Sequence, residues 1–252
     1  MKRCLPFIFS IVASAALAAD LQPSKDAGPY VPSPQSVVSD MLRYAEVGAD
    51  DFLIDLGSGD GRIVIAAARR FGARGLGIEL DEALVRTSRE NARRAGVADR
   101  ASFAQGDVLT ADFSAATVVT LYLLPELIGR LQPRFLTDLK PGTRVVSHAF
   151  RMTGWRPDAS QTLQVAGPHP GQGDESTLYL WIVPAAVRGV WAGGGMRVRI
   201  EQNYQEIDVE GATEATLRGA DIAWRSPAGR FSGRVEGDRI IGDDTRVLAR
   251  ER

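Results

Sequence analysis

The feature that most constrains this chain is a glycine-rich loop between a short apolar run and a helical pattern. Residues 52–56, Phe-Leu-Ile-Asp-Leu, have the composition of a buried strand, and glycine then occupies every second position of residues 57–61. The spacing of apolar residues over 62–71 predicts a helix directly after the loop. Glycine adopts positive φ without strain, and the first turn of a helix presents unpaired N–H groups. The order of these elements therefore predicts a site for a nucleotide-sized ligand.

The spacing of the glycines distinguishes between two classes of nucleotide ligand. A dinucleotide-binding loop has the pattern G-x-G-x-x-G, whose third glycine allows close helix–strand packing beneath a pyrophosphate. Here Gly57, Gly59 and Gly61 alternate, and Arg62 occupies the third position of that pattern. Asp55 precedes the first glycine, where a carboxylate would repel a pyrophosphate but can pair with an ammonium group. The loop therefore disfavours an NAD-dependent dehydrogenase and favours S-adenosyl-L-methionine, whose methionine part carries an ammonium.

Two further acids follow predicted strands. Glu79 lies near the end of the second apolar run, where its carboxylate can accept hydrogen bonds from both ribose hydroxyls. Asp107 follows the third run and can accept a hydrogen bond from the adenine amino group. NAD would use Glu79 equally well, so it is Asp55, Arg62 and Asp107 together that favour S-adenosyl-L-methionine.

Short apolar runs alternate with amphipathic stretches up to residue 183, which predicts an α/β fold with a mainly parallel sheet covered on both faces. The predicted strands are residues 52–56, 75–80, 101–105, 117–122, 143–150, 162–165 and 177–183. The first predicted helix begins at residue 36 and ends before Gly48. The other predicted helices cover residues 62–71, 82–95 and 125–139. The last two strands have no clear helix between them and can form an antiparallel hairpin at the sheet edge.

The pattern changes after Pro184, which suggests a domain boundary. Short alternating runs without helical period predict a small all-β module over residues 185–252. These runs are residues 196–201, 205–210, 215–224, 231–235 and 239–241. A module of roughly 65 residues is marginally stable alone, so we expect it to pack against the first domain or against a second subunit.

The N-terminus has the pattern of an export signal. Lys2 and Arg3 form a basic region, residues 5–17 are apolar, and Ala16-Leu17-Ala18 is a small-x-small cleavage site. The apolar run is shorter than the about 20 residues that span a bilayer. We therefore expect a signal peptide over residues 1–18, a flexible lead-in over 19–29 and an exported protein, periplasmic or extracytoplasmic. Anchoring in the membrane by an uncleaved N-terminus is the alternative.

Composition excludes several kinds of site. The formal net charge of −1 gives no electrostatic reason to expect a nucleic-acid partner. Cys4 lies in the predicted signal peptide, so the mature chain would have no disulfide, thiolate nucleophile or cysteine metal site. The two histidines, His148 and His169, make no case for a metal site without cysteines. His148 lies in a strand pattern and is predicted to be a packed, hydrogen-bonded residue.

The motifs resemble those of class I, seven-stranded S-adenosylmethionine-dependent methyltransferases. The matching segments are the glycine loop with Asp55 ahead of it, Gly-Ile-Glu-Leu at residues 77–80, and Gly-Asp at residues 106–107. Residues 30–34, 59–66 and 144–150 followed by Trp155 resemble more narrowly the mitochondrial protein-lysine methyltransferases of the adenine nucleotide translocase and of the ATP synthase c subunit.

This resemblance covers residues from about 28 to 183. It implies a Rossmann-like methyltransferase domain over residues 30–184, with S-adenosyl-L-methionine as cofactor. It also implies a protein lysine as methyl acceptor, including one in a membrane protein. The predicted export signal leaves a non-catalytic S-adenosylmethionine-binding protein as one alternative, because S-adenosylmethionine is made in the cytoplasm. Two departures from the family pattern leave the lysine substrate open, with a small-molecule methyltransferase as the other alternative. Tyr-Leu-Leu-Pro at residues 122–125 replaces an aromatic–glycine–x–proline segment, and the module after Pro184 has no counterpart.

The predicted cofactor site follows from these motifs. Its residues are Asp55, Gly57, Ser58, Gly59, Gly61, Glu79, Leu80, Asp107 and Val108. The resemblance adds Ser33 and Pro34, which would close over the methionine end of the cofactor.

Catalysis of methyl transfer can rest on positioning, because the reaction is an in-line displacement. A lysine acceptor has a reference pKa of about 10.4 and must lose its proton before it attacks. Tyr122 and Glu126, near the end of the fourth predicted strand, are the candidates to assist. The alternatives are that Tyr122 belongs to the core and that Glu126 only favours a helix N-terminus.

Overall fold

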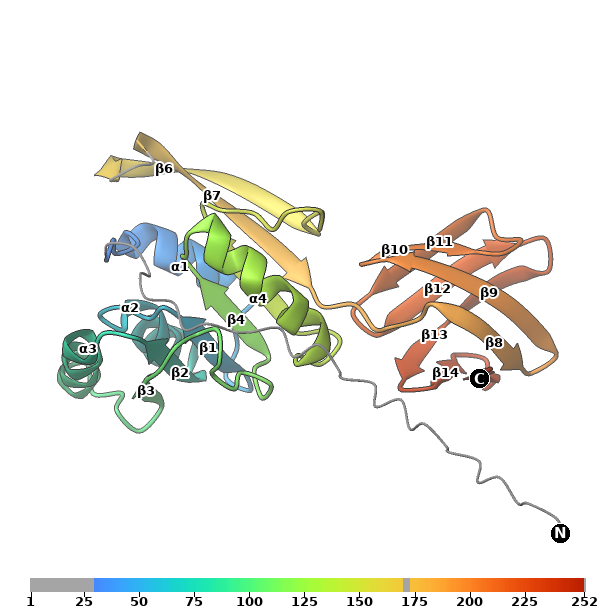
Figure 1. Ribbon diagram of the computed structural model, residues 1–252, viewed down its shortest axis with the longest axis horizontal. Coiled ribbons are helices and arrows are strands. Elements are labelled where there is room, and N and C mark those ends of the chain that lie inside the picture. The colour runs from blue at the N-terminus through green and yellow to red at the C-terminus, as the bar shows by residue number, and fades with distance from the viewer. Residues whose placement is uncertain (1–29, 170–172, 252) are drawn as a thin grey trace, which may run out of the picture.

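The computed structural model describes residues 30–169 and 173–251, which form two β-sheets with separate cores (Figure 1). The predicted signal peptide, residues 1–18, and the predicted lead-in, residues 19–29, lie outside these residues. Within the described part of the chain, no helix is long and apolar enough to cross a membrane.

The first sheet has seven strands in the order β3-β2-β1-β4-β5-β7-β6. Its strands are β1 (Phe52–Leu56), β2 (Arg74–Glu79), β3 (Ala101–Gln105), β4 (Val118–Leu121), β5 (Arg144–His148), β6 (Ala159–His169) and β7 (Gly173–Ile182). The strands β1 to β5 are parallel, and β7 runs antiparallel to both of its neighbours. This arrangement confirms the predicted α/β fold, and β6 and β7 form the expected antiparallel hairpin at the sheet edge.

Helices cover both faces of this sheet because its strands are apolar on both sides. The helices are α1 (Gln35–Tyr44), α2 (Arg62–Ala66), α3 (Glu82–Arg94) and α4 (Pro125–Thr137). Side chains of α1, α2 and α3 share one buried core with the sheet, and side chains of α4 share the other. The helix predicted over residues 62–71 forms, but its second half is the π-helical segment η1 (Ala67–Phe71).

Two features of the fold determine what surrounds the carboxyl ends of the parallel strands. The N-cap residue Asp81 accepts a hydrogen bond from the backbone N–H of Ala83 at 2.7 Å, which begins α3 immediately after β2. The order of strands reverses between β1 and β4, which adjoin each other in the sheet. Open α/β sheets bind ligands at such a switch point, beyond the carboxyl ends of the strands.

The second sheet has eight antiparallel strands in the order β10-β9-β8-β15-β14-β13-β12-β11, around a core that includes Trp191 and Trp224. Its strands are β8 (Gly189–Gly193), β9 (Met196–Asn203), β10 (Glu206–Val209), β11 (Glu214–Arg218), β12 (Asp221–Ser226), β13 (Gly229–Glu236), β14 (Arg239–Gly242) and β15 (Val247–Arg250). The all-β fold of this region agrees with the prediction.

Its strand boundaries differ from the prediction at three places. The run predicted as one strand over residues 215–224 is two strands, β11 and β12, because Gly219 adopts φ +60° and the chain turns there. The strands β8 and β15 were not predicted. Each is short; β8 begins and ends with glycine, and β15 lies between Arg246 and Glu251, so the alternation of apolar residues is weak in the sequence.

The second sheet packs against the first domain through the turn between β9 and β10. The ring of Tyr204 stacks on Trp155 with centroids 5.1 Å apart. Tyr204 Oη accepts a hydrogen bond from Gln132 Nε2 of α4 at 2.9 Å, and Trp155 Nε1 donates to Gln205 Oε1 at 2.8 Å. This contact with the first domain is one of the two arrangements expected for a module that is marginal alone.

Candidate active site

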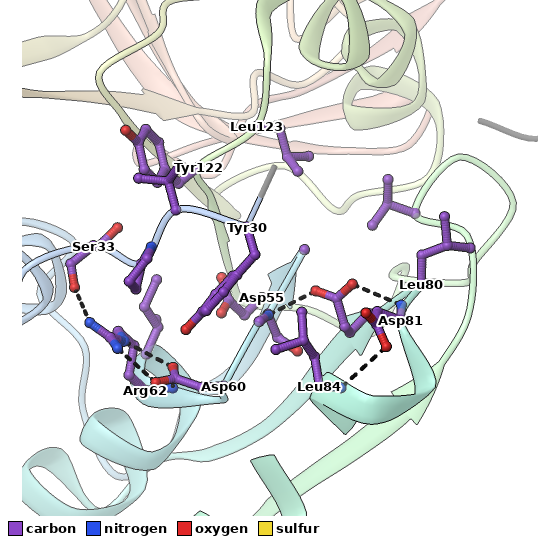
Figure 2. A pocket seen from close by; sticks show the side chains of 18 of the residues that line it. Tyr30, Ser33, Asp55, Asp60, Arg62, Leu80, Asp81, Leu84, Tyr122 and Leu123 are labelled. Carbon is purple, nitrogen blue, oxygen red and sulfur yellow. Dashed lines mark hydrogen bonds and ion pairs between the residues drawn. The ribbon is translucent and has the colours of Figure 1, made fainter. Parts of the chain in front are cut away.

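A cavity of about 410 Å³ lies beyond the carboxyl ends of β1, β2 and β4, at the switch point of the sheet (Figure 2). This volume is within the range of roughly 300–1,000 Å³ that is usual for small-molecule sites. The cavity is lined by Tyr30, Val31, Pro32, Ser33, Asp55, Gly57, Ser58, Gly59, Asp60, Arg62, Ile63, Glu79, Leu80, Asp81, Leu84, Asp107, Val108, Tyr122, Leu123 and Leu127.

The glycine loop forms the floor of this cavity and needs its glycines. Gly57, Gly59 and Gly61 have φ of +79°, +53° and +82°, a conformation that other residues adopt only with strain. A Cβ atom on Gly59 would lie 2.4 Å from the ring of Tyr30. The backbone N–H of Gly59 donates to Glu79 Oε2 at 2.9 Å, which joins the loop to the end of β2.

Ser58, in the same loop, is 4% exposed, and its hydroxyl oxygen is buried. Among the described residues, its Oγ has no hydrogen-bond partner. This oxygen packs against Gly77 of β2, where an added Cβ would lie 2.5 Å from it, so Ser58 lines the cavity through its other atoms.

Asp55 is the most deeply buried acid of the cavity, at 2% exposed. Burial raises the pKa of Asp55 to about 7, against the hydrogen bond that Thr120 Oγ1 donates to it at 2.7 Å. The negative charges of Glu79 and Asp60 raise this pKa further. A cation placed beside Asp55 would lower this pKa, because a nearby positive charge favours the carboxylate form.

Glu79 is held at the cavity edge by two backbone groups. Its Oε2 accepts from Gly59 N at 2.9 Å, and its Oε1 accepts from Asp81 N at 3.0 Å. Each carboxylate oxygen can accept a second hydrogen bond. Glu79 can therefore bind two hydroxyls of a ligand without releasing its own backbone partners.

The charged residues of the cavity are mostly acidic. We call its five carboxylates the acidic lining; they are Asp55, Asp60, Glu79, Asp81 and Asp107. Arg62 is the basic residue among the described lining residues. A cavity with this balance favours a ligand with positive charge and disfavours phosphate.

The residues 30–34, here called the proline segment, are held over the cavity by Arg62. Its guanidinium Nη2 pairs with Asp60 Oδ2 at 2.7 Å, and its Nη1 donates to the backbone oxygen of Ser33 at 2.7 Å (Figure 2). Burial opposes ionisation of Asp60, but the hydrogen bonds and charge of Arg62 hold the pKa of Asp60 below its ordinary value. Burial, followed by the charge of Asp60, raises the pKa of Tyr30.

Tyr122 lines the cavity from the segment after β4. Its ring centroid is 4.1 Å from that of His148 and 6.2 Å from that of Phe150. Burial raises the pKa of the Tyr122 phenol, which keeps it neutral at physiological pH. It can therefore offer a hydrogen bond to an acceptor group, and ionisation to a phenolate base is disfavoured.

The comparisons with known proteins agree with this geometry. The profile of the ANTKMT methyltransferase domain matches residues 55–159, which include the end of β1, the glycine loop and β2 to β5. A protein-lysine N-methyltransferase of Saccharolobus islandicus is 41% identical over 156 residues, which are 62% of this chain and 93% of that protein. The chain belongs to the ANTKMT methyltransferase family.

A solved structure also matches this member of the ANTKMT family closely. The crystal structure of an RNA methyltransferase from Salinibacter ruber in complex with S-adenosyl-L-homocysteine is 52% identical, with a TM-score of 0.57, and the match covers 62% of this chain and 96% of that one. A lysine N-methyltransferase of the ATP synthase c subunit, from Xenopus laevis, is 35% identical over 52% of this chain and 57% of its own length.

The protein is thus an S-adenosylmethionine-dependent methyltransferase, as its sequence motifs implied. The cofactor supplies a methyl group activated on a sulfonium. The cavity suits this ligand by its acidic lining and by the close approach that the glycine loop allows. Asp55 is the residue that would hold the ammonium of the methionine part, and Glu79 the one that would hold the ribose hydroxyls.

Most residues predicted for the site surround the cavity of this ANTKMT-family chain. They are Ser33, Asp55, Gly57, Ser58, Gly59, Glu79, Leu80, Asp107, Val108 and Tyr122. Among the described residues, three predicted ones do not line it. Pro34 caps the start of α1, Gly61 packs where its Cβ would meet Phe103 at 2.6 Å, and Glu126 lies exposed in the first turn of α4.

Several lining residues were not predicted. The polar ones are Tyr30, Asp60, Arg62 and Asp81. Tyr30 stood in a motif that carried the family resemblance, and Arg62 had served only to exclude a dinucleotide loop. The apolar ones are Val31, Pro32, Ile63, Leu84, Leu123 and Leu127, whose side chains reach the cavity from helices and connections that sequence periodicity assigns to the core.

Proposed function

We propose that this enzyme transfers the methyl group of S-adenosylmethionine to the side-chain nitrogen of a protein lysine. The observation that carries the proposal is its 41% identity to a protein-lysine N-methyltransferase over 93% of that protein. Its 35% identity to a lysine N-methyltransferase of the ATP synthase c subunit points to the same substrate class. A membrane protein is therefore among the acceptors to test.

The cavity provides for the amine in two ways. The acidic lining attracts an ammonium group as it approaches, because five carboxylates face one guanidinium. Tyr122 is a neutral phenol, whose pKa burial raises further, and its oxygen can accept a hydrogen bond from the amine N–H and orient the amine. The amine must lose a proton before it attacks, and partial burial beside Tyr122 and Leu123 favours its neutral form.

RNA methylation is the second candidate, because the 52% identical structure from Salinibacter ruber is that of an RNA methyltransferase. Two observations on this chain favour lysine over RNA. The chain has a net charge of −1, and the acidic lining surrounds the site where a phosphate-bearing acceptor would have to approach.

Methyl-labelled cofactor distinguishes these acceptors directly. The purified enzyme would be incubated with labelled S-adenosylmethionine and a total membrane and ribosome fraction, and the product divided between protease and ribonuclease. Label that protease releases as methyl-lysine supports the proposal. Label that only ribonuclease releases overturns it in favour of RNA, and label in neither polymer favours a small-molecule acceptor or a non-catalytic binding protein. Asp55→Asn provides the background control.

We also propose that the chain is exported. The support is the basic region, apolar run and small-x-small site within residues 1–18. Cell fractionation with mass spectrometry of the N-terminus tests it. A periplasmic or extracytoplasmic chain that begins near Ala19 is expected, and a cytoplasmic chain that begins at Met1 would refute it. A chain retained in the membrane with residues 1–18 intact would show the anchored form.

A further inference from the structure

We propose that His148 is a positioning residue for methyl transfer, which links the proline segment on the cofactor side to Tyr122 on the acceptor side. The imidazole is fully buried at the end of β5. The proposal rests on the methyltransferase activity and does not depend on which acceptor receives the methyl group.

The first observation is that both ring nitrogens of His148 have serine partners. Ser33 Oγ of the proline segment lies 2.9 Å from Nδ1, and Ser176 Oγ of β7 lies 3.1 Å from Nε2. A neutral imidazole has one N–H donor and one acceptor nitrogen, while a hydroxyl can do either. The two serines therefore satisfy the ring in either tautomer. This confirms the predicted packed state of His148 and fixes the plane of its ring.

The second observation is that Ser33 is held from two sides. Arg62 binds its backbone oxygen, and His148 binds its hydroxyl. Arg62 reaches Ser33 from the start of α2, whereas His148 reaches it from the sheet itself. Because Ser33 lines the cavity, these two contacts determine how closely the proline segment covers the cofactor.

The third observation is the packing of Tyr122 on the same ring. The two ring planes are 37° apart with centroids separated by 4.1 Å, and Phe150 lies on Tyr122 with nearly parallel planes, 16° apart. Between the two flanking rings, Ala149 has φ +69°, and Phe150 N donates to His148 O at 2.9 Å. This is a strained three-residue turn. Such strain persists where surrounding packing imposes it, often at functional sites, and here it places both rings against Tyr122.

One buried ring thus contacts the cofactor cover and the acceptor side at once. Loss of the hydrogen bond between Nδ1 and Ser33 should lower cofactor affinity, whereas loss of the ring that contacts Tyr122 should lower kcat. Substitutions of His148 can remove them separately. His148→Phe keeps an aromatic ring and loses both hydrogen bonds. His148→Asn places an amide near the position of Nδ1 and loses the ring.

The test measures S-adenosylmethionine affinity by calorimetry, and kcat and acceptor KM by label transfer, for both variants. His148→Phe should weaken cofactor binding about fivefold to tenfold, which is the effect of losing one buried hydrogen bond. Ser33→Ala should weaken it to the same extent. His148→Asn should keep cofactor affinity within about twofold and lower kcat about tenfold, because Tyr122 loses its support. Ser176→Ala keeps the bond to Ser33 and serves as the matched control.

Melting temperatures of all four variants separate positioning from folding. Native cofactor affinity in both His148→Phe and Ser33→Ala would overturn the proposal. The proposal would also be overturned if, in every variant, the losses of affinity and kcat were proportional to the decrease in melting temperature. If His148→Phe does not fold, Ser33→Ala still decides the cofactor role, since it removes one oxygen atom. The calorimetric measurements need no acceptor, so failure of the lysine proposal would not affect them.

Discussion

At the scale of single residues, the fold gives neighbouring carboxylates different protonation behaviour. Burial raises the pKa of Asp55 to about 7, while Arg62 holds the pKa of Asp60 below its ordinary value. Asp60 is therefore a permanent partner of Arg62 in the structure. Asp55 instead lies in a position where the arrival of a cation would change its charge state.

This difference predicts a pH dependence of cofactor binding. The pKa of Asp55 in the free protein is about 7, and an ammonium beside it would lower that pKa. Binding then releases a proton below this pH, so affinity should rise up to about tenfold per pH unit between about pH 5.5 and pH 7 and level off above. Calorimetry across this range measures it. Asp55→Asn should bind weakly and show no such rise, and an equal slope in this variant would contradict the assignment.

The same group predicts the opposite trend for the stability of the free protein. Its folded pKa of about 7 exceeds the ordinary value of 3.8, so the folded state binds the proton more tightly than the unfolded state does. The contribution of Asp55 to stability is therefore fully present below pH 3.8 and is lost as the pH rises to about 7. Asp55→Asn should therefore increase the free energy of unfolding, relative to the native protein, by more at about pH 7.5 than at about pH 5.5. Urea unfolding of the two proteins at both pH values checks this, and a gain independent of pH would argue against the raised pKa.

Glu79 should contribute to affinity through its geometry. Both of its oxygens accept backbone N–H groups, and an amide in its place would turn an NH₂ group toward one of them. Glu79→Gln should therefore weaken S-adenosylmethionine binding by about tenfold or more, since hydrogen bonds to charged groups contribute about 1.5–3 kcal/mol. Glu82→Gln, in the first turn of α3, removes an exposed carboxylate that does not line the cavity. It is a control for a loss of charge near the site, and it should bind normally.

At the scale of elements, the glycine loop and the proline segment form one unit. Tyr30 lies against Gly59, and Arg62 at the start of α2 reaches back to Ser33. The loop was recognisable in the sequence because its spacing is local. Its contact with the proline segment was not, because the contacting residues lie 29 positions apart.

Substitution of glycines should separate backbone strain from this contact. Gly59→Ala adds both an unfavourable φ of +53° and a Cβ at 2.4 Å from Tyr30, and should weaken cofactor binding more than tenfold. Gly96→Ala has a φ of +69° but open space, and should cost about 1 kcal/mol of stability with normal binding. Gly106→Ala meets only an ordinary contact at 3.6 Å and should be tolerated. Equal affinities in all three variants, measured by calorimetry, would contradict this reading of the loop.

At the scale of the whole molecule, the second sheet is attached away from the cavity. Gly219 in the β11–β12 turn approaches Gly142, which precedes β5, and Ala185 N donates to Gly219 O at 2.7 Å. These contacts lie at the amino ends of the parallel strands, whereas the cavity lies at their carboxyl ends. The contact of Tyr204 with Trp155 and α4 extends this attachment along one face of the first domain.

The attachment should therefore affect stability more than cofactor binding. Tyr204→Ala removes the stacked ring and the partner of Gln132, and should destabilise the protein by about 2–4 kcal/mol. Tyr204→Phe removes only the hydroxyl and should cost about 1 kcal/mol. Urea unfolding measures both, and S-adenosylmethionine affinity should stay within about twofold of the native value. A large loss of affinity in Tyr204→Ala would show that the second sheet influences the cavity.

Local patterns in the sequence were enough to predict the fold class, the cofactor and most strand boundaries of the first domain. Each apolar run, the glycine pattern and the position of each acid at a strand end are defined by a few consecutive residues. The strands of the second sheet were harder to predict, because the two-residue turn at Gly219 lies within residues 215–224, whose apolar pattern suggests one continuous strand.

The tertiary structure decided which further residues join those that the sequence had already placed at the site. It brought Tyr30, Arg62 and His148 together with Tyr122 around one cavity and its cover, and it left Glu126 exposed outside. The physical reason is that these contacts join residues far apart in sequence, such as Ser33 and His148, which are separated by 115 positions. Periodicity describes how each segment meets the core, and it contains no information about which segments meet each other.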